Sequence, residues 1–230
     1  MIYIYYINFL IVYVKNLSIT IILIVIFMDL MGILTIIVAI IVLIGVIYNV
    51  FRLFEKSKPK VEYIVLLAIL VAICVVGRLI GMSIPSIQLA SFVIIMVGIV
   101  YGGETGFLVG ILTAIVSDLF MGLGYWTFFQ MLAWGLMGYT SGLFSDKLDN
   151  IWIRVPFGFI WAFIYGFITD FAMIPYMSAL NLEGFIALYV AAIPLDLVHG
   201  LINAVLLAVA YKWFKNIFER NKVKFLNPVE

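Results

Sequence analysis

The chain has 230 residues, of which 67% are hydrophobic and only 11% are charged, and its mean hydropathy is +1.27. A water-soluble domain of this size cannot hide so much apolar surface, whereas a membrane protein can, because lipid itself solvates that surface. The composition therefore excludes an ordinary soluble enzyme. The net charge of +1 gives no indication of a partner, and we expect no nucleic acid among the partners.

The apolar runs are predicted to be membrane-spanning helices. Each crossing needs about 20 largely apolar residues, so the length allows roughly six to eight crossings joined by short loops. The runs are continuously apolar rather than alternating, which favours helices over the strands of a membrane barrel. The predicted fold class is all-α and polytopic, with a six-helix core and one or two extra N-terminal hydrophobic helices.

Residues 1–60 are predicted to precede the core as hydrophobic segments followed by a basic cytoplasmic linker. Residues 31–54 are a good candidate for one extra helix with its basic end inside. Residues 1–27 are apolar but are interrupted by Lys15. They are a further crossing, a segment on the membrane surface, or an over-called start, since two methionines follow them. They lack the basic start and the small-residue cleavage site of a typical signal peptide.

Residues 61–220 are predicted to form the core, and residues 221–230 a cytoplasmic tail. Short polar or glycine-containing connections separate the apolar runs of the core. Six of these runs are predicted to cross the membrane, at about 62–82, 89–101, 106–120, 128–144, 151–174 and 186–213.

Lysine and arginine residues indicate the orientation of these helices. Basic residues cluster before the first crossing, around the fourth connection and after the last crossing, whereas the opposite side of the core carries only Arg78. By the positive-inside rule both ends of the core are cytoplasmic. The connections after the first, third and fifth crossings are therefore expected on the outer side.

Polar residues of the core gather in the outer halves of the predicted helices. A charge near the bilayer centre costs several kcal/mol, so such residues usually face protein or a water-filled cavity. By helical spacing, Asp118 shares a face with two glycines of its helix, and His199 shares a face with Asp196. We therefore expect a polar pocket beneath the outer connections, built as small-molecule sites usually are. The candidate residues for the pocket and its rim are Arg78, Gln88, Asp118, Tyr125, Trp126, Gln130, Asp170, Tyr176, Asn181, Asp196 and His199.

Several of these residues also have a structural interpretation. Tryptophan and tyrosine at a membrane boundary often anchor a protein in the interface. For Trp126 this interpretation and a contact with the ligand are equally well supported. Arg78 with Asp118 or Asp170 forms a structural ion pair in one interpretation. His199 alone is typical of a hydrogen-bonded contact between helices. The glycines of the third crossing are interpreted as packing positions.

Motifs for catalysis or metal binding are not evident. The single cysteine, Cys74, lies in an apolar run, and no Cys–His cluster has metal-ligand spacing, so we expect no metal and no cofactor. There is also no GxxxxGK[ST] phosphate loop, so the chain is not expected to hydrolyse ATP. A small intramembrane enzyme is an alternative, with His199 and Asp196 as its acid–base pair but no evident nucleophile. A structural membrane protein is a further alternative.

The core resembles the S components, which are the substrate-binding membrane subunits of energy-coupling factor vitamin transporters. The resemblance lies in the six helices with both ends cytoplasmic and in the AILVA stretch of the first helix. It is more specific over residues 83–144, which contain IPSIQ, a GxxxG third helix and GLGYWTFFQMLAWGLMG. This segment looks like the branch that includes cobalamin-type S components. Residues 1–60 depart from the six-helix pattern.

The resemblance implies a multi-pass protein of a prokaryotic plasma membrane that captures a vitamin outside and topples within the bilayer. Its implied partners are the vitamin, the lipid bilayer, a transmembrane coupling subunit and two cytoplasmic ATPase subunits. Cobalamin or a related corrinoid is the expected ligand, and another vitamin or a modified-base precursor is the alternative. The resemblance also implies roles for individual residues: docking on the coupling subunit for Ala68 and Ala72, and the binding loop for Gln88, Tyr125, Trp126 and Gln130.

Overall fold

The computed structural model describes residues 60–81, 87–176 and 182–226, together with single positions between 37 and 55. Those single positions are all helical, as expected for the helix predicted over 31–54. The prediction for residues 1–27 lies outside the described residues. The chain divides into two compact units, Met1–Ile47 and Tyr48–Glu230, and the helices below all belong to the second.

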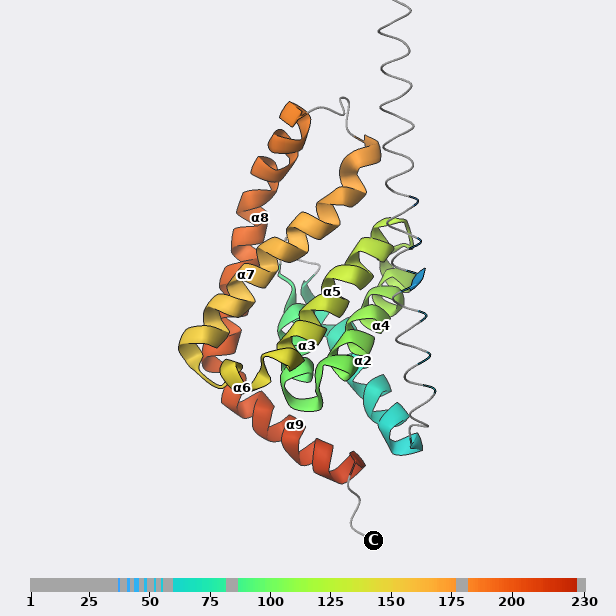
Figure 1. Ribbon diagram of the computed structural model, residues 1–230, viewed down its shortest axis with the longest axis vertical. Coiled ribbons are helices and arrows are strands. Elements are labelled where there is room, and N and C mark those ends of the chain that lie inside the picture. Colours follow the sequence, from blue (N-terminus) through green and yellow to red (C-terminus); the bar gives the residue numbers. More distant parts are fainter. Residues whose placement is uncertain are drawn as a thin grey trace, which may run out of the picture. The chain divides into compact units, whose positions relative to one another are not determined.

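The second unit consists of helices over its described residues, which confirms the predicted all-α class. Helices coincide with each of the six predicted crossings (Figure 1): α2 (Val61–Gly81), α3 (Leu89–Tyr101), α4 (Gly103–Met121), α5 (Trp126–Leu143), α7 (Ile151–Asp170) and α8 (Leu182–Val209). Three further elements accompany them: α6 (Ser145–Leu148), the 3-10 helix η1 (Phe171–Tyr176) and α9 (Tyr211–Leu226).

Within the described residues, four helical segments are long and apolar enough to cross a membrane: Val61–Gly81, Gly103–Met121, Ile151–Ile174 and Leu182–Val209. These segments confirm a polytopic membrane protein. The helix α3 is shorter but equally apolar, and nearly all of its side chains are buried by its neighbours. Its apolar surface therefore packs against protein instead of lipid.

Glycines bring α3, α4 and α5 together with backbones in direct contact. A Cβ on Gly106 of α4 would stand 2.5 Å from the carbonyl oxygen of Gly138 on α5, and 2.9 Å from the Cα of Gly98 on α3. A Cβ on Gly110 would overlap the backbone at Trp134. Because these obstacles are backbone atoms, no side chain fits at either position. The packing interpretation of the third-crossing glycines is thereby confirmed.

The helices α7 and α8 form an antiparallel pair (Figure 1), and Arg154 joins them at the end that is predicted to be the inner one. The Arg154 side chain is buried and donates to the carbonyl oxygens of Leu207 at 2.9 Å, Leu148 at 2.9 Å and Asp149 at 2.8 Å. It also stacks on the ring of Tyr211 at 3.5 Å. One guanidinium therefore joins the start of α7 to the junction of α8 and α9.

The predicted sixth crossing, about 186–213, ends earlier than expected. The chain turns at Ala210, and α9 continues as a separate helix through residues 221–226 of the predicted tail. From residue 211 onward basic and apolar residues alternate at helical spacing, so only one face can be buried. That face packs beneath α3, where the rings of Phe214 and Phe92 lie 4.9 Å apart.

Candidate functional site

A buried arginine joins three helices in the half of the bundle that is predicted to lie towards the outer side. Arg78 in the last turn of α2 donates to Asp118 of α4 at 2.7 Å and to the Ser117 hydroxyl. It also donates to Gln130 of α5 at 2.9 Å, and its guanidinium lies 4.8 Å from the centre of the Trp134 ring. The side chains of Arg78 and Asp118 are 9% and 1% exposed. A charge pair so deeply buried is tolerated because further hydrogen bonds satisfy its remaining polar atoms.

The second carboxylate oxygen of Asp118 fixes the connection between α4 and α5. It accepts a hydrogen bond from the Thr127 hydroxyl at 2.6 Å, and Thr127 in turn accepts from the backbone N–H of Gly124 at 3.3 Å. Gly122, at the end of α4, has a φ of 109°, which a residue with a side chain rarely adopts. The glycines and the carboxylate together produce a tight outer turn.

A second group of polar side chains surrounds Ser91 of α3. The Ser91 hydroxyl accepts from the Trp134 indole at 3.0 Å and lies 2.9 Å from Nε2 of His199 on α8. The Tyr165 ring of α7 lies between them, 5.2 Å from the Trp134 ring and 5.4 Å from the imidazole. Gln88, at the N-cap of α3, is hydrogen-bonded to the Tyr165 hydroxyl.

Trp134 connects the two groups, because its ring contacts Arg78 and its indole N–H contacts Ser91. Side chains from α2, α3, α4, α5, α7 and α8 therefore form one hydrogen-bonded and stacked network. Such a network is strengthened by its low-dielectric surroundings when its members are satisfied. The Oε1 atom of Gln88 is buried but has no hydrogen-bond partner within the described part of the chain. It is an acceptor available to a ligand that carries a donor.

The structure thus brings five of the predicted site residues into one network. These are Arg78, Gln88, Asp118, Gln130 and His199. Their polar atoms largely contact other side chains of the network instead of lining an open polar hollow. The structural interpretations of Arg78 as an ion pair with Asp118 and of His199 as a contact between helices both describe contacts that are present.

Two of the predicted rim residues lie at the start of α5, outside this network. Tyr125 and Trp126 are half-buried, and their rings meet edge to face at 5.6 Å. The Trp126 indole lies against Gly124, where a Cβ would meet it within 2.5 Å. The two rings therefore cover the outer turn from one side.

The two remaining acidic candidates lie between α7 and α8. The Asp196 carboxylate sits against Gly166, where a side chain would collide with it. It is close enough to Asp170, the last residue of α7, for the two charges to interact. The Oδ2 atom of Asp170 is buried without a hydrogen-bond partner among the described residues. These two carboxylates are separate from the Arg78–Asp118 pair.

Other predicted positions are exposed or fall outside the description. Ala68 and Ala72 lie on an exposed, wholly apolar stripe of α2. Tyr176 is the last residue of η1 and its side chain lies outside the described part, as does all of Asn181.

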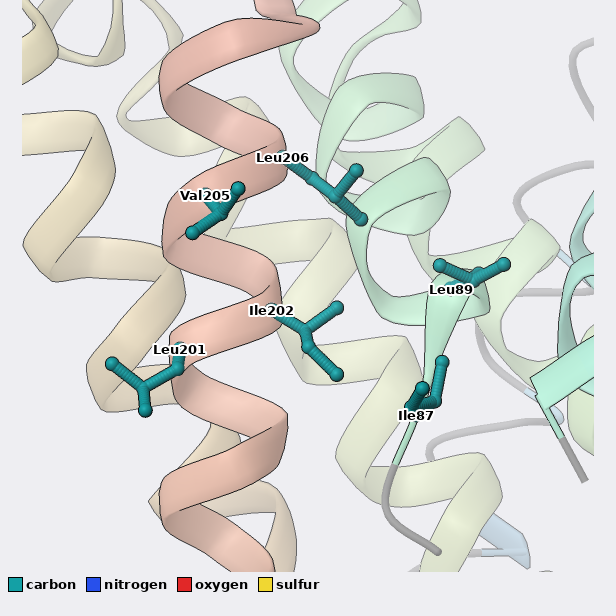
Figure 2. Close-up of a pocket in the computed structure, with 6 residues that line it drawn as sticks. All are labelled: Ile87, Leu89, Leu201, Ile202, Val205 and Leu206. Carbon is teal, nitrogen blue, oxygen red and sulfur yellow. The ribbon is translucent and has the colours of Figure 1, made fainter. Parts of the chain in front are cut away.

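An apolar groove lies beside the network, between the start of α3 and the middle of α8. Its volume is about 310 Å³. In Figure 2 the side chains of Ile202 and Leu206 point from α8 towards the start of α3. The residues of one wall flank Gln88 in the chain, and those of the other wall follow His199. Its lining is apolar throughout: Ile87, Leu89, Leu201, Ile202, Val205 and Leu206.

The arrangement does not favour catalysis. Ser91 and His199 are at hydrogen-bonding distance, as a nucleophile and its base would be, but they are 0% and 2% exposed and lie between helices. Ser117 donates to the carbonyl of Thr113 at 2.6 Å, so its hydroxyl proton is already engaged. Among the described residues no group of His, Cys, Asp and Glu could hold a metal ion.

Helical spacing in the sequence did not identify several residues of the network. Ser91, Ser117 and Thr127 resemble the many serines and threonines that bond only to their own helix backbone. Ser117 immediately precedes Asp118, and this adjacency is the one local signal that could have identified it. Ser91 and Thr127 acquire their role only when α8 and α4 are packed against them.

Comparison with known proteins gives one further finding. A family model described as ECF-type riboflavin transporter, S component, matches residues 58–216. This range is more than half of the chain, and it contains the whole network and the groove. No curated protein and no solved structure matches the chain.

Proposed function

The chain belongs to the family of ECF-type riboflavin transporter S components, and on this basis we propose that it captures riboflavin, or a close analogue, for import. As an S component it is a substrate-specific transport subunit of a membrane and not an enzyme. S components bind a small vitamin and work with a membrane coupling subunit and ATPases. The expected S-component family is thereby confirmed. The match gives no support to the cobalamin-type branch.

The family match over residues 58–216 carries the proposal. The groove and the network support it through their chemistry. Riboflavin has a flat fused ring with methyl groups at one end and an N–H between two carbonyls at the other. The apolar groove suits the methyl-bearing end, and the Oε1 atom of Gln88 suits the N–H. Polar groups that fix orientation beside an apolar wall are the usual composition of a ligand site.

Corrinoids remain the second candidate, on the resemblance of residues 83–144. The groove volume of about 310 Å³ is at the lower end of the roughly 300–1,000 Å³ of small-molecule pockets. A tricyclic vitamin is closer to this size than a corrin macrocycle with its nucleotide tail. The groove is open at the surface, where Leu201 and Val205 are 51% and 60% exposed, so its volume sets no upper limit on the ligand, and the family model carries the choice of riboflavin.

We further propose that the exposed stripe of α2 docks on the coupling subunit. Ala68 and Ala72 are one helical turn apart, and Ile64, Ile69 and Ile73 beside them are 49%, 44% and 39% exposed. Small residues within an apolar stripe permit close contact with another membrane helix. The opposite face of α2 carries Arg78, so the docking helix is bonded directly to the network. We also propose that two ATPase subunits are partners of the chain and that it lies in a prokaryotic plasma membrane.

Thermal unfolding of the purified chain with a panel of vitamins tests the proposed ligand. We expect riboflavin to raise the unfolding midpoint without ATP, and corrinoids to leave it unchanged. A rise with a corrinoid alone would replace riboflavin by the second candidate. In cells, uptake should disappear when the ATPase subunits are deleted, and uptake by this chain alone would contradict the proposal.

Two variants test the residues. Gln88→Leu removes the acceptor at similar volume and is expected to weaken binding by about tenfold, as one lost hydrogen bond does. Ile202→Trp fills the groove and is expected to abolish binding. Ile193→Trp, on an exposed part of α8, is the matched control and should bind like the wild type.

A further inference from the structure

Two exposed tryptophans lie at the inner end of the bundle. Trp152 in the first turn of α7 is 84% exposed, and Trp213 in the first turn of α9 is 65% exposed. Arg154 follows Trp152 by two residues and stacks on Tyr211, which precedes Trp213 by two. This contact holds the first turns of α7 and α9 together. Both indoles therefore belong to one end of the structure.

Positive charge is concentrated at the same end. The helix α9 carries five basic residues and one acidic residue, a net charge of +4 in a chain whose net charge is +1. Two of its lysines are used internally, since Lys215 contacts Asp149 and Lys222 donates to the carbonyl of Val100 at 2.6 Å. Other cations of this end are exposed: Lys147 of α6, and Lys212 and Arg220 of α9.

These groups are held on a rigid element. The buried face of α9 packs beneath α3, where the Tyr101 hydroxyl donates to the carbonyl of Phe218 at 2.9 Å and the two rings lie 5.7 Å apart. The helix begins directly after the membrane-spanning α8 ends. Its first turn is therefore at the depth of the lipid head groups on the side that the basic residues mark as cytoplasmic.

We propose that the inner rim, made by Lys147, Trp152, Lys212, Trp213 and Arg220, binds anionic phospholipids of the cytoplasmic leaflet. Indole rings favour the depth of the head groups, and the lysine and arginine side chains reach the phosphates. Each basic residue near an anionic membrane surface contributes about a fivefold preference. The rim is independent of the vitamin site, so neither proposal depends on the other.

Quenching by brominated lipid tests the rim in the full chain. The protein is reconstituted into mixed phosphatidylcholine and phosphatidylglycerol bilayers in which one or the other lipid carries bromine on its acyl chains. Bromine quenches adjacent tryptophans, so the ratio of the two signals gives the relative occupancy of the lipids. We expect phosphatidylglycerol to be favoured at least fivefold. Three other tryptophans remain in the chain, so the preference for phosphatidylglycerol, and not all of the quenching, should be lost when Trp152 and Trp213 are both replaced by Phe.

Charge variants make the test specific. The double variant Lys212→Gln with Arg220→Gln should lose most of the preference, whereas Lys212→Arg with Arg220→Lys keeps the charge and should retain it. Thermal unfolding in pure phosphatidylcholine verifies that both variants fold. Equal quenching by the two lipids in the wild type would overturn the proposal, as would an unchanged preference in the Gln variant. If the Gln variant instead assembles poorly with the coupling subunit, the rim is a protein interface and the lipid proposal is wrong.

Discussion

The two halves of the helical unit are held together by different means. In the half formed by α3, α4 and α5, backbones touch at Gly106 and Gly138, and no atom can be added between them. In the half formed by α7 and α8, the long helix α8 buries only four of its residues, His199, Gly200, Asn203 and Leu207. The first half is fixed by shape along its whole length. In the second, the close contacts at glycines are with side chains, since Leu207 lies against Gly158 and Phe159 against Gly200, and Arg154 joins the two helices at one end.

This difference indicates which part moves when a ligand binds. Helices whose backbones touch cannot shift by small amounts, because a small shift either overlaps atoms or opens a gap between them. The pair α7–α8 contacts the rest of the bundle through polar groups, such as His199 on Ser91, and through aromatic rings, such as Tyr165 on Trp134. We expect α3, α4 and α5 to remain fixed while α7 and α8 adjust around a vitamin. The following predictions test that contrast, beginning with the largest effect.

Gly138→Val is expected to prevent folding. Its side chain would overlap the backbone of Gly106, and a backbone cannot turn aside as a flexible side chain can. The yield of monodisperse protein after detergent extraction measures the effect. Gly45→Val is the matched control, because no atom of the described residues lies within 4 Å of a Cβ there. Normal yield from Gly138→Val would show that the close-packed half is not fixed by shape.

Asp118→Ala is expected to lower the free energy of unfolding by about 3–5 kcal/mol, because it leaves the buried Arg78 charge unpaired. Thermal unfolding in detergent measures the loss. The double variant Arg78→Met with Asp118→Leu removes both charges and should recover most of the stability. If the double variant is no more stable than Asp118→Ala, the ion pair stabilises the fold by more than the neutralisation of its two charges.

Arg154→Met is expected to cost about 2 kcal/mol, since several carbonyl oxygens lose a charged donor. Hydrogen exchange should increase in α7 and α8 while the amides of α4 and α5 keep their protection. This pattern would separate the two halves directly. A uniform increase along the chain would show that Arg154 stabilises the bundle as a whole and that the contrast is incorrect.

The smallest expected effect is a dependence of stability on acid pH at Asp149. The Lys215 ammonium and the Tyr211 hydroxyl, which donates at 2.5 Å, hold the pKa of Asp149 below its ordinary value of 3.8. A lowered pKa stabilises the fold above the unfolded value, and this contribution is lost as the pH falls through the folded value. The Asp149 side chain is 56% exposed, so the contribution is less than about 1 kcal/mol.

Asp149→Asn provides the measurement. Its unfolding midpoint should be slightly below that of the wild type at pH 7, and the difference should shrink below about pH 4. Asp146→Asn, at an exposed position of α6, is the control for the loss of one surface carboxylate. A difference that is constant from pH 7 to pH 3 would mean that the charge of Asp149 does not contribute.

The sequence predicts the helices well, because lipid requires long apolar runs and the breaks between them are glycine-rich or polar. It also predicts that Arg78, Asp118 and His199 turn inward, since a charge or an imidazole in lipid is too costly. The packing role of Gly106 follows from its spacing for the same reason. These predictions depend on the solvent around each helix and not on its neighbours.

Partners within the network could not be predicted in the same way. Spacing identifies the face on which His199 lies, but that its partner is Ser91 depends on how α8 crosses α3. The burial of Arg154 was not predicted, because a basic residue near a helix start is expected to face the cytoplasmic surface. Its burial follows from three carbonyl oxygens that only the packed structure brings together.

Direct titration of the purified chain with riboflavin tests the central claim most simply. Flavin fluorescence is followed without ATP or partner subunits, with the groove-filling Ile202→Trp variant as the comparison. We predict saturable one-to-one binding by the wild type and none by the variant. Equal binding by both proteins would contradict the site, and no binding of riboflavin by the wild type would contradict the proposed substrate.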